Sequence, residues 1–278
     1  MTTPPKDAPA LVLHDRIDPW QIGALHATLD LPGAAPGVGD PLPPLWHFVQ
    51  FREARPRSDL GGDGHPKLGG FIPDFGLPRR MWAGGRLTFL APLLVGDAAT
   101  RRSTVLKTAL KDGRSGRLAF VTVLHEITGP AGLAIREEQD IVYREAHDPD
   151  APARAAPPPA PQDAAWMAER AADPTLLFRY SALTFNGHRI HYDLDHARHT
   201  EGYDGLVVHG PLLAQCMADL ARTCEGRPLA AFSFRAVSPV THGAGFAICG
   251  MPDGTDAARL WVRGPGGGLA MEGTAQFA

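Results

Sequence analysis

The sequence predicts an α+β fold in which one unit, a helix with a curved antiparallel sheet, occurs twice. Strand-like alternation of apolar and polar residues fills two separate regions, 85–143 and 229–277. A segment with helical periodicity precedes each region, and a Pro- and Ala-rich stretch lies between the halves. Alternating strands joined by short turns favour an antiparallel sheet, and a helix in each half would cover one of its faces.

The two halves also repeat each other in detail. Pro92 and Gly96 interrupt the strand pattern of the first half, as Pro239 and Gly243 do in the second. The last strand of each half opens with the same Gly-Leu-Ala tripeptide. These echoes indicate a duplicated unit. We therefore predict an N-terminal domain, a linker and a C-terminal domain, at residues 1–145, 146–163 and 164–278.

In the first half, Asp18 and Pro19 fit the cap and the first position of a helix over residues 20–29. Apart from an apolar run at 46–51, the chain from 33 to 82 is rich in Gly and Pro. It is too broken for regular structure. Strands are expected at 85–110, with the interruption noted above, 118–127 and 133–143.

In the second half, residues 164–172 fit either a short helix or the end of the linker. Five of the twelve histidines then fall between Tyr180 and Glu225. From Pro211 onward, apolar residues recur with helical spacing, and a proline suits the first turn of a helix. Strands are expected at 229–237, 244–250, 258–262 and 269–277.

The composition excludes several classes of protein. The chain has 278 residues, 44% hydrophobic and 21% charged, with net charge −3, as in an ordinary soluble globular protein. No basic run exceeds two residues, so nucleic acid is not an expected partner. No apolar run approaches the roughly 18–20 residues of a membrane span. Three cysteines without metal-binding spacing, in a chain without a signal peptide, predict a cytoplasmic protein.

A histidine-bearing loop and a helix start lie close together in the second half. The backbone N–H of Gly210, at the start of that helix, can donate to a carbonyl oxygen that gains negative charge. An imidazole near its ordinary pKa of about 6.5 can move protons at neutral pH. The segment can therefore bring a proton-transfer group and an oxyanion site face to face.

Two motifs of the second half, TFNGHRIHYD at 184–193 and EGYDGLVVHGPLLA at 201–214, resemble the MaoC-like dehydratase/hydratase family. The first half resembles it more diffusely, through GFIPDFGLPRRMWAGGRLTF at 70–89. The likeness is to the branch that includes mesaconyl-CoA and itaconyl-CoA hydratases and 3-hydroxyacyl-thioester dehydratases. It implies a double hotdog, two helix-wrapping curved antiparallel sheets in one chain, with an acyl-CoA thioester in a tunnel between them.

The resemblance also implies a reaction, the reversible hydration of an enoyl-CoA to a 3-hydroxyacyl-CoA. Short branched dicarboxylic substrates, mesaconyl-CoA or itaconyl-CoA going to citramalyl-CoA, are the first expectation. Ordinary 3-hydroxyacyl thioesters of CoA or acyl carrier protein are the second. No cofactor is expected, because CoA arrives as part of the substrate. The oligomeric state stays open between a monomer and a homodimer.

Three residues carry the expected chemistry. The resemblance assigns His191 as the catalytic histidine and Gly210 as the oxyanion donor. The family motif has an Asp five residues before the histidine, whereas this chain has Asn186, whose amide cannot accept a proton as a carboxylate does. We therefore expect His191 to act as general base and acid, and Asn186 to orient water or the thioester.

Other residues of the second half are candidates for substrate binding. His188 would line the pocket or brace the loop, and His209 would pack at the turn before the helix or contact the substrate. Arg189 would grip a substrate carboxylate or a CoA phosphate, or remain a surface charge. The histidine spacing invites a zinc interpretation. We expect no metal, because His196 and His199 lie among charged residues typical of a solvated surface.

The first half has no counterpart of the NGHRIH motif, so we expect it to form the other wall of the tunnel. Arg79 and Arg80 are candidates for a phosphate or a carboxylate, and Trp82 for an acyl or adenine surface. Alternatively, this segment only covers the edge of the sheet.

Two other functions are compatible with the same fold. An acyl-CoA thioesterase would need a carboxylate against the thioester carbonyl, and the NGHRIH motif contains none. A non-catalytic acyl-CoA-binding protein would have no need for both His191 and Gly210. Release of free thiol would indicate the first, and binding without turnover the second.

Overall fold

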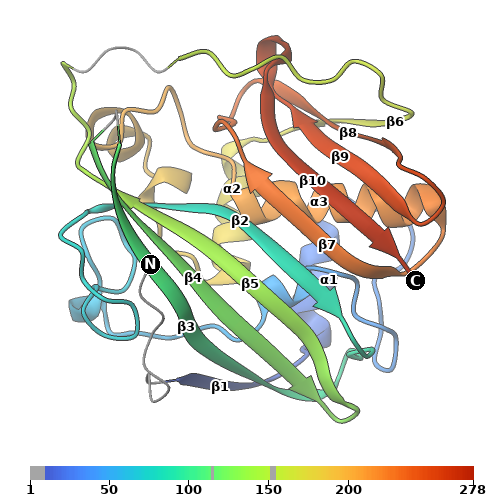
Figure 1. Cartoon of the computed structure of the whole chain (residues 1–278). Coiled ribbons are helices and arrows are strands. Elements are labelled where there is room, and N and C mark those ends of the chain that lie inside the picture. Colours follow the sequence, from blue (N-terminus) through green and yellow to red (C-terminus); the bar gives the residue numbers. More distant parts are fainter. Residues whose placement is uncertain (1–9, 114–115, 151–154) are drawn as a thin grey trace.

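Ten strands form one antiparallel sheet in which the two halves of the chain lie side by side (Figure 1). The computed structural model describes residues 10–113, 116–150 and 155–278. The first half contributes β1 (Leu11–Arg16), β2 (Arg79–Phe89), β3 (Ala98–Gly113), β4 (Gly116–Gly129) and β5 (Gly132–Arg144). The second half contributes β6 (Trp166–Ala171), β7 (Leu229–Ala236), β8 (Gly245–Pro252), β9 (Ala257–Arg263) and β10 (Leu269–Phe277).

The strand order, β1-β3-β4-β5-β2-β7-β10-β9-β8-β6, places one half on each side of a central pair. In that pair β2 and β7 run antiparallel, with Gly84 opposite Arg235 and Thr88 opposite Ala231. Close approach at this seam requires glycine, because a Cβ on Gly84 would lie 2.5 Å from the carbonyl oxygen of Phe234. The predicted repeat of an antiparallel sheet is therefore present, and its two copies are hydrogen-bonded to each other.

In the part of the chain that the structure describes, three α-helices accompany the sheet: α1 (Pro19–Thr28), α2 (Pro174–Thr184) and α3 (Gly210–Glu225). Asp18 caps α1 by accepting from the backbone N–H of Trp20 at 2.9 Å, as the Asp-Pro pair predicts. The long helix α3 crosses behind β7 to β10 (Figure 1) and buries the apolar stripe that the sequence indicated. Short helical turns complete the list: η1 (Trp46–Val49), η2 (Arg57–Asp59), η3 (Arg189–His191), η4 (His196–Thr200) and η5 (Pro265–Gly267).

The prediction of one helix per half was wrong for the second half. By order along the chain, α1 corresponds to α2, since each follows a short edge strand. The long helix α3 has no counterpart among the described residues of the first half. There, only η1 and η2 lie between α1 and β2. The inner face of the first half is therefore free of a long covering helix, which leaves room for a cavity.

Three strands differ from the sequence prediction. Residues 166–171 form β6, not a helix, because they pair with β8 along the sheet edge. Strand β1 was not predicted, and it pairs with β3 at the opposite edge. Strand β2 begins at Arg79, inside a stretch that had looked too broken for regular structure. In each case the hydrogen bonds of a neighbouring strand decide the conformation, and local sequence cannot show them.

Among the residues that the structure describes, no helix has the length and hydropathy to cross a bilayer. The three cysteines are all free, with Cys216 half-buried, Cys224 exposed and Cys249 buried.

Candidate active site

A cavity of about 1390 Å³ lies between the two halves of the chain. Its wall combines His65, Arg80 and Trp82 from the first half with Asn186, His209 and Pro211 from the second. His188, His191 and Gly210 are not part of this wall. They lie directly behind it, because His65 packs on His188, His209 stacks on His191, and Gly210 is flanked by His209 and Pro211.

His191 is fixed by two neighbouring segments. It ends the short turn η3, and its Nδ1 donates to the carbonyl oxygen of Val207 at 2.8 Å. Because a carbonyl can only accept, the proton lies on Nδ1, and Nε2 carries the free lone pair. Burial lowers the pKa of His191 to about 4, although its bond to Val207 opposes the shift. At neutral pH the ring is therefore a neutral base with a defined tautomer.

His209 packs directly against the ring of His191. Its ring stacks on His191 with centroids 3.6 Å apart, and its Nε2 hydrogen-bonds the Ser181 hydroxyl at 2.9 Å. Burial, followed by the nearby histidines, holds the pKa of His209 well below its ordinary value. Both interpretations of the sequence apply to this residue, since it is hydrogen-bonded in the packed interior and also lines the cavity.

Gly210 begins α3 immediately after His209. Its backbone N–H belongs to the first turn of the helix, where amide groups have no partner within the helix. The nearest atoms to a Cβ built on Gly210 would be the Trp82 carbonyl oxygen at 3.8 Å and the Met271 Cε at 3.9 Å. The start of α3 therefore faces β2 of the first half, at the boundary where the cavity lies.

Asn186 follows α2 and lines the cavity. Its Oδ1 accepts from the backbone N–H of His188 at 3.0 Å, which fixes the orientation of its side-chain amide. The residue before it, Phe185, has a left-handed backbone with φ of 52°. A strained cap of this kind at the end of a helix needs support from its surroundings, and such positions cluster at functional sites.

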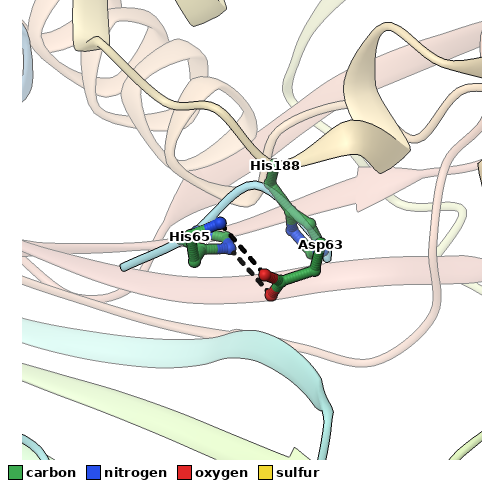
Figure 2. Close-up of side chains that lie close together, drawn as sticks. All are labelled: Asp63, His65 and His188. Atoms are coloured by element: carbon green, nitrogen blue, oxygen red, sulfur yellow. Dashed lines mark hydrogen bonds and ion pairs between the residues drawn. The ribbon is translucent and has the colours of Figure 1, made fainter. Parts of the chain in front are cut away.

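A loop from the first half completes the site, and sequence reasoning missed it. Asp63 accepts from the backbone N–H of His65 at 3.0 Å, and its other oxygen lies 3.3 Å from Nδ1 of the same histidine. The His65 ring meets His188 edge to face with centroids 4.4 Å apart (Figure 2). The first half therefore supplies a carboxylate and an imidazole to the loop at residues 186–191. The NGHRIH sequence of that loop contains no carboxylate.

Backbone contacts dock this loop onto the histidine motif. The backbone N–H of Arg189 donates to the Asp63 carbonyl oxygen at 2.9 Å. The side chain of Arg189 donates through Nη1 to the Gly62 carbonyl oxygen at 3.0 Å. Gly64 and Gly187 face each other so closely that a Cβ on Gly187 would lie 2.7 Å from the Gly64 carbonyl oxygen. The Gly-rich sequence GGDGHP, with an Asp two residues before a His, is the signal that could have drawn attention to this loop.

The pKa shifts of Asp63, His65 and His188 are consistent with a hydrogen-bonded Asp–His pair. Burial alone would raise the pKa of Asp63, but the hydrogen bonds and charge of His65 outweigh it, and the net pKa is lowered. Burial, and then the charge of Arg80, lower the pKa of His65. Burial and the neighbouring histidines also lower the pKa of His188. Asp63 is thus ionised at neutral pH, while both rings are neutral.

Asp63, His65 and His188 are also the one group of metal-ligand type found among the described residues. Their ligand atoms all lie within 4.8 Å of one another. Three ligands can hold a catalytic metal ion. One of the three, Nδ1 of His65, already faces the Asp63 carboxylate. The arrangement therefore has an explanation without a metal ion, as a hydrogen-bonded Asp–His pair.

The predicted surface location of His196 was wrong. His196 is 6% exposed and lines the cavity, whereas His199 is exposed and pairs with Asp195 at 3.4 Å. The neighbouring Glu201 is also buried, since Arg79 donates to its carboxylate and to its carbonyl oxygen, both at 2.7 Å.

The remaining candidates for substrate binding have different environments. Arg79 is committed to Glu201, and Arg189 is committed to Asp193 through two bonds of 3.0 and 2.8 Å. Arg80 lines the cavity and forms no ion pair with any described residue. The indole of Trp82 donates to the Gly84 carbonyl oxygen at 2.9 Å, and its ring meets Phe48 at the cavity wall. Of the predicted cations, Arg80 is thus the one available to a ligand.

Comparison with known proteins gives a consistent result. A model of the family described as hydroxyacyl-thioester dehydratase type 2 matches residues 45–242. The mesaconyl-C(4)-CoA hydratase of Chloroflexus aurantiacus is 48% identical over 257 residues, which span 91% of this chain and 90% of that protein. The mitochondrial hydroxyacyl-thioester dehydratase type 2 of Schizosaccharomyces pombe is 28% identical over 247 residues, 80% of each chain.

Solved structures with low sequence identity share the fold. HtdX of Mycobacterium tuberculosis superposes with a TM-score of 0.67 at 19% identity, covering 97% of this chain and 100% of its own. A peroxisomal multifunctional enzyme type 2 from Drosophila melanogaster gives 0.65 at 14% identity, covering 97% of this chain and 48% of its own. The predicted double hotdog is confirmed.

Proposed function

We propose that this chain, which belongs to the hydroxyacyl-thioester dehydratase type 2 family of MaoC-like hydro-lyases, hydrates mesaconyl-CoA to citramalyl-CoA. The family makes the chain a hydratase/dehydratase of enoyl and 3-hydroxyacyl thioesters, so the predicted reaction class is confirmed over a thioesterase or a non-catalytic binder. The choice of substrate has one main support, the 48% identity over 91% of this chain to a mesaconyl-C(4)-CoA hydratase. Itaconyl-CoA and unbranched enoyl thioesters are the alternatives to test.

In the proposed mechanism His191 is the general base. Its Nε2 takes a proton from water, and the water oxygen attacks the β-carbon of the unsaturated thioester. The electron pair of the double bond moves toward the thioester oxygen, where negative charge develops. The proton held by His191 then passes to the α-carbon. One water is added across one double bond, and the imidazole returns to its neutral form.

Gly210 stabilises the charge that develops on the thioester oxygen. A backbone N–H at a helix start donates without reorganising, and the positive end of the α3 dipole adds to the effect. Asn186 orients the attacking water or the thioester with its side-chain amide. His209 supports His191 by stacking and remains neutral, so no positive charge next to the base opposes its protonation during the reaction.

Asp63 and His65 are added to the proposed site as positioning residues. The family motif would place an Asp where this chain has Asn186. Asp63, from the other half of the chain, supplies a carboxylate close to the same loop. We assign it the task of orienting His65, which packs on His188 and so holds the loop that carries His191.

The proposal is tested by following the loss of enoyl-thioester absorbance with mesaconyl-CoA, itaconyl-CoA and crotonyl-CoA as separate substrates. The expected result is a kcat/KM for mesaconyl-CoA at least about tenfold above that for the other two, a preference that one or two specific contacts supply. A preference for crotonyl-CoA would overturn the substrate assignment and leave the hydro-lyase class intact.

The remaining partners are proposed more broadly. CoA is the carrier named by the relative at 48% identity, with acyl carrier protein as the alternative. A homodimer could form at the sheet edges, where β1 and β6 each have one side that pairs with no other described strand. Free cysteines favour a reducing compartment such as the cytoplasm. Sedimentation of the purified protein would decide the oligomeric state.

A further inference from the structure

A band of polar side chains lies on the inner face of the first-half sheet, where an apolar face is the norm. Ser103 on β3 lies opposite His125 on β4, and His125 lies opposite Glu137 on β5. Their exposures are 1%, 9% and 3%, so all three point into the protein. Gln139, two residues along β5, faces the same cavity. A buried polar row across three strands costs stability, which indicates a task other than packing.

Apolar clusters border this polar band on both sides. On one side, Val121, Val123 and Ile141 pack under the loop that contains Phe71 and Phe75. On the other side, Ile127 and Ile135 join the main core. The sheet therefore changes from apolar to polar and back to apolar within a few residues, and the polar part opens into the cavity together with Val123 and Ile141.

The members of the band are joined by hydrogen bonds. The Ser103 hydroxyl lies 2.7 Å from Nδ1 of His125, and Nε2 of His125 lies 3.2 Å from Oε1 of Gln139. Nε2 of His47, on the facing turn η1, donates to the Glu137 carboxylate at 3.2 Å. Burial by itself would raise the pKa of Glu137, but His47 outweighs it and the net pKa is lowered. Glu137 is therefore ionised and accepts this hydrogen bond from His47.

The segment that faces the band is held in a strained conformation. Leu45 and Phe51, at its two ends, have φ of 68° and 56°, values that side chains other than glycine rarely adopt. Phe51 is fixed there because its backbone N–H donates to the Asp15 carboxylate at 2.7 Å. The strained ends direct His47 and Gln50 to the cavity wall. Strain of this kind persists where function requires a particular geometry.

Several polar atoms at this end of the cavity have no hydrogen-bond partner among the described residues. They include both amide atoms of Gln50, Nδ1 of His47 and Nε of Arg101. Gln50 and His47 are 2% and 3% exposed. Buried polar atoms without partners are uncommon, and three such residues around one cavity call for a polar ligand.

Arg101 is the cation of this group, and it is already oriented. Its Nη2 donates to the Phe51 carbonyl oxygen at 3.2 Å, and its guanidinium lies over the Phe51 ring at 5.5 Å. No carboxylate of the described residues forms an ion pair with it, although Glu137, Glu53 and Asp15 are near enough to act on its charge. A half-buried, preorganised arginine without an ion-pair partner is suited to a carboxylate ligand.

We infer that this polar end of the cavity binds the free carboxylate of a dicarboxylic acyl thioester, with Arg101 forming the ion pair and the side-chain amide of Gln50 donating a hydrogen bond. The inference rests on the proposed function, because mesaconyl-CoA carries such a carboxylate at the end of its acyl group opposite the thioester. Trp82 connects the two ends of the cavity, since its backbone adjoins Gly210 and its ring packs on Phe48, beside His47. An acyl group held at Gly210 would lie along these rings.

The test compares Arg101→Gln and Arg101→Lys with the wild type, using mesaconyl-CoA and crotonyl-CoA, which lacks the second carboxylate. Loss of a charge-assisted hydrogen-bond pair should lower kcat/KM for mesaconyl-CoA by about 10- to 100-fold in Arg101→Gln. Arg101→Lys should lose less, because the charge remains. Turnover of crotonyl-CoA should stay within about threefold of wild type, which also shows that the variant is folded.

Arg102→Gln is the matched control, because Arg102 is the next residue on β3 and is exposed on the opposite face. It should leave both substrates unaffected. A parallel loss with both substrates in Arg101→Gln, or unchanged mesaconyl-CoA turnover, would overturn the carboxylate site while leaving the proposed function in place. Failure of the wild type to prefer mesaconyl-CoA would overturn the proposed substrate, and the carboxylate site with it.

Discussion

The imidazole rings of His191 and His209 stack face to face, with centroids 3.6 Å apart and planes inclined by 17°. Each ring is held by a different partner, His191 by the Val207 carbonyl oxygen and His209 by the Ser181 hydroxyl. Charging either ring would place a cation in a buried site next to another titratable ring, which is unfavourable. Burial, to which the stacked ring contributes, lowers the pKa of His191 and keeps it neutral at physiological pH, the form that a general base requires.

Replacement of His191 by Gln should remove the base and retain much of the packing. We expect kcat for the preferred enoyl-CoA to fall by about 10²–10⁴, the usual contribution of a positioned proton-transfer group. His199→Gln is the control, because His199 is an exposed histidine of the same segment. Near-normal turnover by a folded His191→Gln protein would show that another group is the base.

The pH dependence of activity should follow the lowered pKa of His191. With a pKa of about 4, the ring is almost entirely in its basic form at pH 6 to 8. We expect kcat/KM to be flat from neutral pH down to about pH 5 and to decline as pH falls through about 4. An inflection near pH 6.5, the ordinary value for histidine, would mean that the base is more solvated than this structure shows.

Stability should depend on pH through the same group. The pKa of His191 is lower in the folded protein than in the unfolded chain, so the unfolded chain binds more protons between about pH 6.5 and pH 4. The contribution of neutral His191 to the free energy of unfolding is fully present above pH 6.5. It is lost as pH falls toward 4, by an amount on the order of 3 kcal/mol. The free energy of unfolding, measured with urea across this range, should fall less steeply in His191→Gln. Equal slopes for the two proteins would contradict this origin.

Gly64→Ala tests whether the docked loop supports the site. Gly64 has φ of 91°, and an added Cβ would collide with the Gly187 carbonyl group, so the two loops would have to separate. We expect a loss of about 1–3 kcal/mol from backbone strain, together with a lower kcat, because the loop that carries His191 would shift. Thermal unfolding and initial rates measure the two effects. Gly62→Ala is the matched control, since its Cβ would have nothing within 4 Å, and it should leave both values unchanged.

Local patterns in the sequence predicted most of the fold. The Asp18–Pro19 cap, the apolar stripe after Pro211 and the alternating strands each report on their own neighbourhood, and each led to the correct element. The edge strands β1 and β6 were missed because each has only six residues, and hydrogen bonds to a partner strand determine its conformation. Pairing between distant segments leaves no local signature.

The candidate site was predictable to the extent that one motif carries it. His191, Asn186 and Gly210 lie within one continuous stretch, so the resemblance could identify them together. Asp63 and His65 reach the same corner only because their loop docks on Gly187 and Arg189. The buried location of His196 and Glu201 was likewise hidden, because the residue that neutralises Glu201, Arg79, lies in the other half.

Chelation separates a metal site from a hydrogen-bonded cluster at Asp63, His65 and His188. Because Asp63 is already bonded to His65 and the proposed chemistry needs only proton transfer, we expect dialysis against EDTA to leave activity unchanged. Metal content of the purified protein should be well below one ion per chain. Loss of activity on dialysis, restored by zinc and absent in His188→Ala, would instead identify a metal centre.

The ion pair between Arg79 and Glu201 joins β2 to the loop before α3, and a double-mutant cycle can measure its contribution. The side chains are 14% and 6% exposed, and Arg79 also donates to the Glu201 carbonyl oxygen. Glu201→Gln alone would leave Arg79 without its neutralising charge, at a cost of up to about 3–5 kcal/mol in the free energy of unfolding. We expect a coupling energy above about 1 kcal/mol for this pair.

The exposed pair of Arg235 and Glu272 is the control for that cycle, because its side chains are 67% and 46% exposed. Solvent screening should hold its coupling energy below about 1 kcal/mol. The measurement is chemical unfolding of the wild type, both single variants and the double variant for each pair. Equal coupling in the two pairs would mean that the buried Arg79–Glu201 ion pair contributes no more than an exposed ion pair does, and that it does not fix the position of the loop before α3.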